Sequence, residues 1–93
     1  MPDTQLRALQ RLARARIKEG QLPPVAPRQI LGGKGDGARC ALCDKTINAD
    51  EVELEVEQRL VGGVQSLHFH VLCHAAWQLA CSERPEEARR SPD

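Results

Sequence analysis

The stretch "HFHVLCHAAW", residues 68–77, holds the three histidines of the chain, one cysteine and its only tryptophan. A cysteine pair, "CALC" at residues 40–43, lies upstream. Zinc in structural sites takes four nitrogen or sulfur ligands in a tetrahedron, which closely spaced pairs of Cys and His commonly supply. The upstream stretch offers a Cys-x2-Cys pair, and the downstream stretch offers a His-x2-Cys pair. The sequence therefore predicts one structural zinc ion with four ligands: Cys40, Cys43, His70 and Cys73.

A second histidine competes for the fourth ligand position. His68 lies two residues before His70, on the same face of a strand. The spacing to Cys73 at the start of a helix favours His70 and leaves His68 as a surface partner of Glu57. His74 follows Cys73 directly and points about 100° away around a helix. We therefore expect His74 to be exposed or to lie just outside the ligand set.

The remaining cysteine and the tryptophan are interpreted as structural residues. Cys81 lies about 12 Å beyond Cys73 along a helix, at a rise of 1.5 Å per residue, so one ion cannot reach both. Cys81 is therefore predicted to be a small buried apolar residue. Trp77 lies one turn after Cys73 and is predicted to shield the metal from water. A redox pair of Cys40 and Cys43 would leave the matching His-x2-Cys pair unexplained.

The segment between the two ligand pairs predicts a β-hairpin. Residues 51–60, "EVELEVEQRL", alternate between apolar and mostly acidic side chains. A period of two predicts a half-buried strand, whose wet acidic face consists of Glu51, Glu53, Glu55 and Glu57. Gly62 and Gly63 fit a two-residue turn before a return strand over residues 64–70. The expected register pairs Val56 with Phe69, Gln58 with Leu67, and Glu57 with His68.

The order of these elements predicts the fold class. A helix over residues 71–83 follows the hairpin and is expected to end before Pro85. Zinc knuckle, hairpin and helix in this order predict a small, zinc-stapled α+β domain over residues 38–84, with a treble-clef-like architecture. Residues 85–93 show no apolar period and predict a disordered tail.

The N-terminal segment, residues 1–20, predicts a separate basic amphipathic helix. Its helical part spans residues 4–19, Asp3 or Thr4 can cap its start, and Gly20 fits its left-handed end. The apolar stripe is formed by Leu6, Leu9, Leu12, Ala13 and Ile17. The basic face is formed by Arg7, Arg11, Arg14 and Lys18. The helix either docks on the domain with its basic face in water, or uses that face to bind a partner or an anionic surface.

Residues 21–37 are interpreted as a connector. Three prolines make its first half stiff, and four glycines make its second half flexible. The stretch "GGKGDG" lacks the Ser or Thr and the preceding strand of a phosphate-binding loop, so a plain linker is favoured. The linker joins the basic helix to the zinc domain.

Charge and composition narrow the function classes. The net charge is zero, but residues 1–39 carry eight Lys/Arg against three Asp/Glu, and residues 40–93 carry five against ten. This split disfavours nucleic-acid binding by the whole surface. The sequence contains no run of 18 apolar residues, so no membrane span is predicted. Without the apolar core of a secretory signal, four cysteines favour thiolates in a reducing compartment, so we expect a cytoplasmic protein.

Two stretches resemble a known zinc module. "CALCDKTI" and "LHFHVLC" resemble the first zinc module of a LIM domain, over residues 38–79. The chain departs from that family in a 26-residue gap between the ligand pairs and in the lack of a second Cys-x2-Cys module. It therefore looks like a single LIM-like finger, and its layout is similar to small bacterial zinc-finger proteins without an established activity. The resemblance implies an interaction, nucleic-acid-binding or scaffold module.

These observations predict a structural zinc protein that acts as a small protein-interaction or regulatory module, without catalysis. Four ligands close the metal site, and the finger is expected to be too small for a deep pocket of several hundred Å³. The expected partner is another protein, or a second copy that pairs its basic helix with the acidic strand. The alternative is a nucleic-acid-binding finger that uses the basic N-terminal region.

Overall fold

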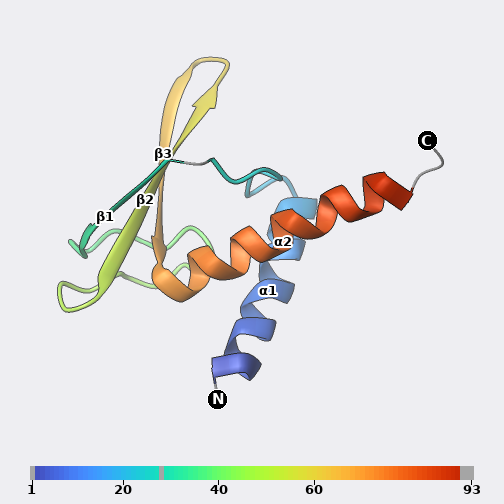
Figure 1. Ribbon diagram of the computed structural model, residues 1–93. Helices are drawn as coiled ribbons and strands as arrows, with labels where there is room; N and C mark the ends of the chain where they lie inside the picture. Colours follow the sequence, from blue (N-terminus) through green and yellow to red (C-terminus); the bar gives the residue numbers. More distant parts are fainter. Residues whose placement is uncertain (1, 28, 91–93) are drawn as a thin grey trace.

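The structure, a computed structural model, describes residues 2–27 and 29–90. The elements are α1 (Pro2–Lys18), β1 (Ile30–Lys34), β2 (Val52–Leu60), β3 (Gly63–His70) and α2 (Val71–Arg90). The strands form one antiparallel sheet in the order β1-β2-β3, so β2 is central. Figure 1 shows the sheet on one side of the molecule and the two helices on the other. The predicted small α+β fold is confirmed at this level.

The hairpin forms as predicted, but its register is shifted by two residues. Val56 pairs with Leu67 rather than with Phe69, and Phe69 pairs with Leu54. The turn uses Val61 and Gly62, while Gly63, with a φ of 149°, is already the first residue of β3. A shift of two keeps every side chain on its face, so the alternation of apolar and polar residues cannot distinguish the two registers.

The second half of the expected connector contains a strand. β1 pairs with β2 along its whole length, from Ile30 opposite Val56 to Lys34 opposite Val52. The glycines of β1 conceal it in the sequence, because they are rare in strands and carry no side chain to form an alternating pattern. The interpretation of residues 21–37 as a plain linker is therefore wrong for β1.

A close backbone approach follows β1 at Gly35. This residue is buried, and its N–H donates to the carbonyl of Glu51 at 2.9 Å. A Cβ at this position would lie 2.1 Å from the carbonyl oxygen of Asn48 and 2.8 Å from that of Ile47. Only glycine fits here, so this position fixes how the end of β1 meets the loop before β2.

We expect Gly35→Ala to destabilise the protein by about 3 kcal/mol, because the added methyl group forces two backbone segments apart. Denaturant unfolding of the metal-loaded protein measures the change. Gly33→Ala is the matched control, because no atom lies within 4 Å of a Cβ built at Gly33. Equal stability of the two variants would show that the approach at Gly35 is not as tight as described.

The sequence suggested an N-terminal helix that is separate from the domain. In the structure this helix packs against the domain. Ala13 is fully buried, Ile17 is 9% exposed, and both belong to the same hydrophobic core as Trp77 of α2. The helix begins at Pro2, before the expected caps Asp3 and Thr4. Its end agrees with the prediction, because Gly20 has a φ of 82°. The stripe that the sequence showed on α1 is thus the surface by which it docks.

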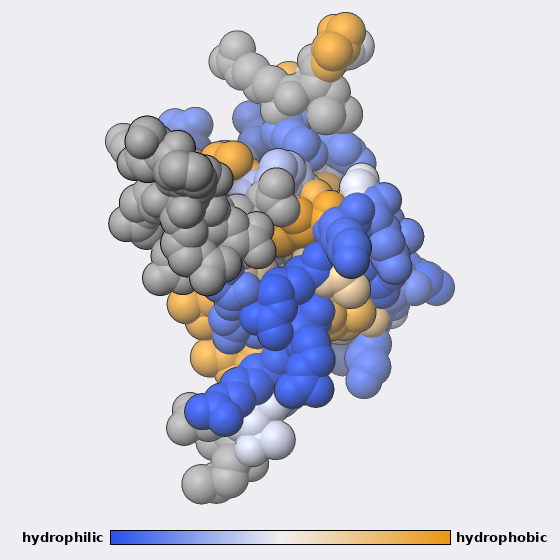
Figure 2. Space-filling view, turned by 90° about the vertical axis from the view of Figure 1, so that its right-hand side faces the viewer, coloured by the Kyte–Doolittle hydropathy of each residue, from blue (hydrophilic) through white to orange (hydrophobic). Residues whose placement is uncertain are grey.

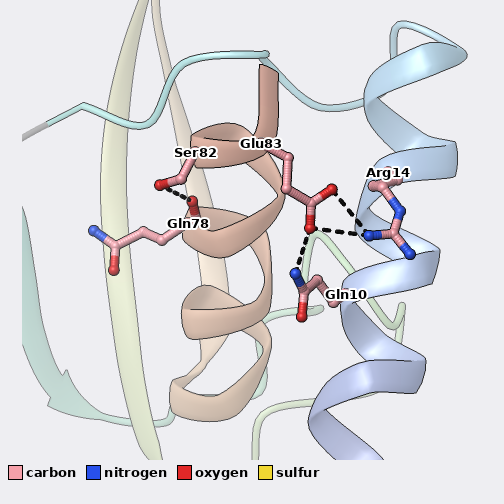
Figure 3. A network of polar contacts seen from close by, with 5 residues as sticks. All are labelled: Gln10, Arg14, Gln78, Ser82 and Glu83. Carbon is pink, nitrogen blue, oxygen red and sulfur yellow. Dashed lines mark hydrogen bonds and ion pairs between the residues drawn. The ribbon is translucent and has the colours of Figure 1, made fainter. Parts of the chain in front are cut away.

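A polar contact joins the two helices at the surface (Figure 3). Glu83 of α2 accepts hydrogen bonds from the guanidinium of Arg14 at 2.9 Å and from the side-chain amide of Gln10. Next to Glu83 in the sequence, the hydroxyl of Ser82 donates to the carbonyl of Gln78, one turn earlier in α2, at 3.1 Å. Arg14 therefore helps to hold α1 on α2, and the part of its guanidinium that bonds to Glu83 is not available to an external partner.

The core lies between α2 and the sheet. Trp77 and Phe69, both with 0% exposure, stack with ring centroids 4.9 Å apart and planes 13° apart. His74 is buried and meets both rings edge-on, which excludes the first of the two expected positions, that of an exposed side chain. Burial lowers the pKa of His74, so its imidazole is neutral near pH 7. The indole N–H of Trp77 donates to the carbonyl of Pro23 at 3.0 Å.

The acidic face of β2 is only partly wet. Glu53 is 7% exposed and Glu55 is half-buried, whereas Glu57 is exposed as expected. Conversely Val52, expected to point into the core, is 55% exposed. The period of two correctly assigned the strand, but it could not show that other parts of the chain cover Glu53. The prediction of a continuous wet acidic face is therefore wrong at Glu53.

The last helix is longer than predicted. α2 continues to Arg90 rather than ending before Pro85. A proline removes one backbone hydrogen bond of a helix without always ending it, so it marks a boundary only as a tendency. The predicted disordered tail of residues 85–93 overlaps these turns, and residues 91–93 lie outside the described residues. No helix among the described residues is long and apolar enough to cross a membrane.

Candidate metal centre

A tight turn presents the first pair of cysteines. The N–H of Asp44 donates to the carbonyl of Cys40 at 3.0 Å, and the N–H of Cys40 donates to the carbonyl of Lys45 at 2.9 Å. Asp44 has a φ of 67°, a left-handed conformation that Asp tolerates better than most residues. The N–H of Ala41 donates to the carbonyl of His68 at 2.7 Å, which fastens this turn to β3.

The second pair comes from the junction of β3 and α2. His70 is the last residue of β3, and Cys73 is the third residue of α2. Nδ1 of His70 lies 3.4 Å from Sγ of Cys43 and 3.9 Å from Sγ of Cys73. All four donor atoms lie within 4.8 Å of one another, in a group formed by Cys40, Cys43, His70 and Cys73. This group, called the cysteine centre below, can hold one metal ion.

The orientation of His70 suits a metal ligand. Its Nε2 lies 3.3 Å from the carbonyl oxygen of Thr46 and 3.5 Å from a carboxylate oxygen of Glu51. An Nε2–H that donates to these oxygens leaves the lone pair on Nδ1, which faces the sulfurs. Metal-binding histidines are usually fixed in this way by an acceptor at their other nitrogen. The surroundings of the site therefore favour His70 as a nitrogen donor.

Cys40 and Cys73 shift each other's pKa in opposite directions. A hydrogen bond from the thiol of Cys73, together with backbone N–H groups of the turn and of His70 and against the effect of burial, lowers the pKa of Cys40 to about 4. The same hydrogen bond, together with burial, raises the pKa of Cys73. Both residues are at most 4% exposed. Thiolates are the form that binds metals, so a cation here replaces the proton that holds the pair together.

The other candidates from the sequence lie outside this group. His68 contacts Glu53, not the expected Glu57, through its Nδ1. Cys81 is buried as predicted, and its thiol lies 3.8 Å from the carbonyl oxygen of Pro23. Trp77 packs on Phe69, and its role in shielding the metal stays a prediction.

A cleft of about 530 Å³ lies against the metal centre. Its walls come from the knuckle, the junction of β3 and α2, and the side of α1, and they include Gln5, Leu9, Cys43, Val52, His70 and Val71. The zinc finger alone was expected to be too small for such a volume, and the cleft exists because α1 supplies one of its walls. The cleft requires α1 to dock beside the metal centre. The apolar stripe of α1 indicates in the sequence that the helix can dock, but it does not indicate where.

A second group of donor atoms was not predicted as a site. Carboxylate oxygens of Glu53 and Glu55 and a ring nitrogen of His68 lie within 4.8 Å of one another. The sequence contained a signal for it, because these residues share one face of the hairpin. From the sequence, the acidic alternation is interpreted as a wet face that can pair with a basic helix, not as a metal site.

Comparisons with known proteins give no match, whether with protein-family models, curated proteins or solved structures. The resemblance to a LIM module therefore rests on the spacing of the ligands. The function of the centre has to be inferred from its own geometry.

Proposed function

We propose that this chain is a zinc-stapled interaction module in which the metal is structural. The observation that carries the proposal is the convergence of three sulfurs and one nitrogen from the knuckle, the end of β3 and the start of α2. Thiolate and imidazole donors together suit zinc. Four protein ligands complete a tetrahedron and leave no position for a substrate water, which supports a structural rather than a catalytic role.

The order of the elements supports a treble-clef-like finger. The cysteine turn is followed by the β2–β3 hairpin and then by α2, whose first turn supplies Cys73. A zinc ion at this point would tie together the cysteine turn, the end of β3 and the start of α2. In a chain of 93 residues with one Trp and one Phe, metal binding would supply a large part of the folding free energy.

The basic face of α1 is the surface we propose for partner binding. Arg7 and Arg11 are exposed and, among the described residues, take part in no ion pair, whereas Arg14 pairs with Glu83. Figure 2 turns the helix side of the molecule towards the viewer and shows hydrophilic residues gathered down that face. The burial of Glu53 weakens self-association through the acidic strand, so an acidic segment of another protein is the favoured partner.

We expect the double variant Arg7→Glu and Arg11→Glu to weaken partner binding at least about tenfold, because each reversal replaces an attraction by a repulsion. Affinity capture from the native host, followed by titration with the captured protein, measures the loss. Lys34→Glu is the matched control, since Lys34 is exposed on β1, away from α1. Unchanged binding of the double variant would refute the role of α1.

Labelled DNA and RNA test the alternative. A nucleic-acid-binding finger would bind them with an affinity that falls steeply as salt rises, because bound cationic side chains release counterions. Binding of this kind, lost in the same double variant, would move the assignment from protein partner to nucleic acid. The metal content should remain one zinc per chain in all these variants.

A further inference from the structure

The second donor group lies on the face of the hairpin that the acidic residues of β2 share. Glu55 is directly opposite His68 in the β2–β3 register, and Glu53 is diagonal to it. Side chains at opposite and diagonal positions on one face of an antiparallel pair reach each other. Nδ1 of His68 is in contact with one carboxylate oxygen of Glu53. The hairpin thus brings two carboxylates and one imidazole together.

Glu53 is the unusual member of this group. The residue is 7% exposed, and its Oε1 has no hydrogen-bond partner among the described residues. A buried carboxylate oxygen without a hydrogen-bond partner destabilises the folded protein. Glu55 adds a second carboxylate within 4.8 Å, whose negative charge repels that of Glu53. One His68 imidazole supplies at most one positive charge, and its Nδ1 already faces the other oxygen of Glu53.

A cation would remove both costs at once. It would accept the lone pair of the unpartnered oxygen and would neutralise the repulsion between the two carboxylates. Carboxylate and imidazole donors together suit divalent ions of the first transition row, such as Mn²⁺, Fe²⁺ or Zn²⁺, whereas thiolates select softer ions. We propose that Glu53, Glu55 and His68 form a second divalent-metal site, distinct from the cysteine centre and independent of the function proposed above.

The two sites differ in their access to water. The cysteine centre has four protein donors, two of them almost fully buried. The second site has three donors, and the side chain of His68 is 30% exposed. Three protein ligands leave at least one coordination position for water or for a small ligand. The second ion would therefore exchange more readily than the first.

Manganese titration of the zinc-loaded protein tests the proposal. Mn²⁺ binds carboxylates and imidazole but competes poorly for thiolates, so it should leave the first zinc in place. Calorimetry should report one added ion per chain. The loss of the electron paramagnetic resonance signal of free Mn²⁺ should give the same number. Bound Mn²⁺ should also broaden the amide signals of residues 53–55 and 66–68. Absence of a second equivalent, or broadening centred elsewhere, would overturn the proposal.

Neighbouring glutamates of β2 provide the matched pair of variants. Glu55→Gln should lower the Mn²⁺ affinity at least about tenfold, because it removes one charged donor. Glu57→Gln removes the same charge two residues further along the same face, where Glu57 is exposed and opposite Ser66. This variant should change the Mn²⁺ affinity less than twofold. An equal loss in both variants would mean that only the general negative charge attracts the ion.

Zinc content separates this proposal from the previous one. Glu55→Gln should keep one zinc and a folded hairpin, since Glu55 lies outside the cysteine group. If no second equivalent of Mn²⁺ binds while the cysteine centre holds zinc, the proposal of a second site is wrong and the proposal of a structural zinc is retained. If Co²⁺ substitution shows no thiolate absorption while Mn²⁺ still binds at residues 53–55, the structural zinc fails and the second site stands.

Discussion

Replacing Cys73 by serine is expected to unfold the domain. The variant removes one of three sulfurs from a site in which all four donors lie within 4.8 Å of one another, and it removes the thiol that donates a hydrogen bond to Cys40. Structural zinc contributes on the order of 10 kcal/mol or more at neutral pH, which exceeds the net stability of most small domains. We expect loss of bound zinc together with loss of dispersed amide signals from the knuckle, the hairpin and α2. Metal analysis and NMR spectra of the same sample measure both.

Cys81→Ala is the control for this experiment. Cys81 is also buried on α2, but it contacts the carbonyl of Pro23 and lies outside the cysteine group. The Cys81→Ala variant should keep one zinc per chain and lose little stability. A strong chelator, or a pH low enough to protonate the thiolates, should reproduce the effect of Cys73→Ser. A folded, metal-free Cys73→Ser protein would show that the apolar core is sufficient and that zinc is dispensable.

The cysteine centre was predictable because its signal is local and chemical. Two ligand pairs with the same spacing specify a coordination chemistry, whichever way the chain runs between them. The choice of His70 over His68 also followed from spacing, and the structure places Nδ1 of His70 against the sulfurs. The strand of β2 was predictable for a similar reason, since alternation of side chains is a property of the local backbone.

The remaining features depend on tertiary contacts that leave no local pattern. The register of the hairpin differs by two residues, a shift that alternation cannot detect. β1 consists partly of glycines, and its identity as a strand comes from β2, not from its own residues. The burial of Glu53 and the cleft beside the metal centre arise only when the whole chain is assembled.

Trp77→Ala is the second variant with a large expected effect. Trp77 has 0% exposure, stacks on Phe69 and holds the residues after α1 through the carbonyl of Pro23. Its removal deletes the largest side chain of the core and leaves a cavity, which typically costs about 3–5 kcal/mol. Denaturant unfolding of zinc-loaded protein measures the loss. Leu79→Ala, on the same helix but 42% exposed, should cost less than about 1 kcal/mol.

Trp77→Phe then separates packing from the hydrogen bond. Phenylalanine keeps a ring that can stack on Phe69 but has no N–H for the carbonyl of Pro23. Pro23 is half-buried and its carbonyl oxygen still lies 3.8 Å from the thiol of Cys81, so loss of the indole N–H should cost about 1 kcal/mol. Trp77→Phe should therefore lie between the wild type and Trp77→Ala in stability. A Trp77→Phe variant as unstable as Trp77→Ala would place most of the effect in the link to Pro23. In that case Trp77 would act chiefly by fastening the α1 end of the chain to α2, and the stack on Phe69 would contribute little.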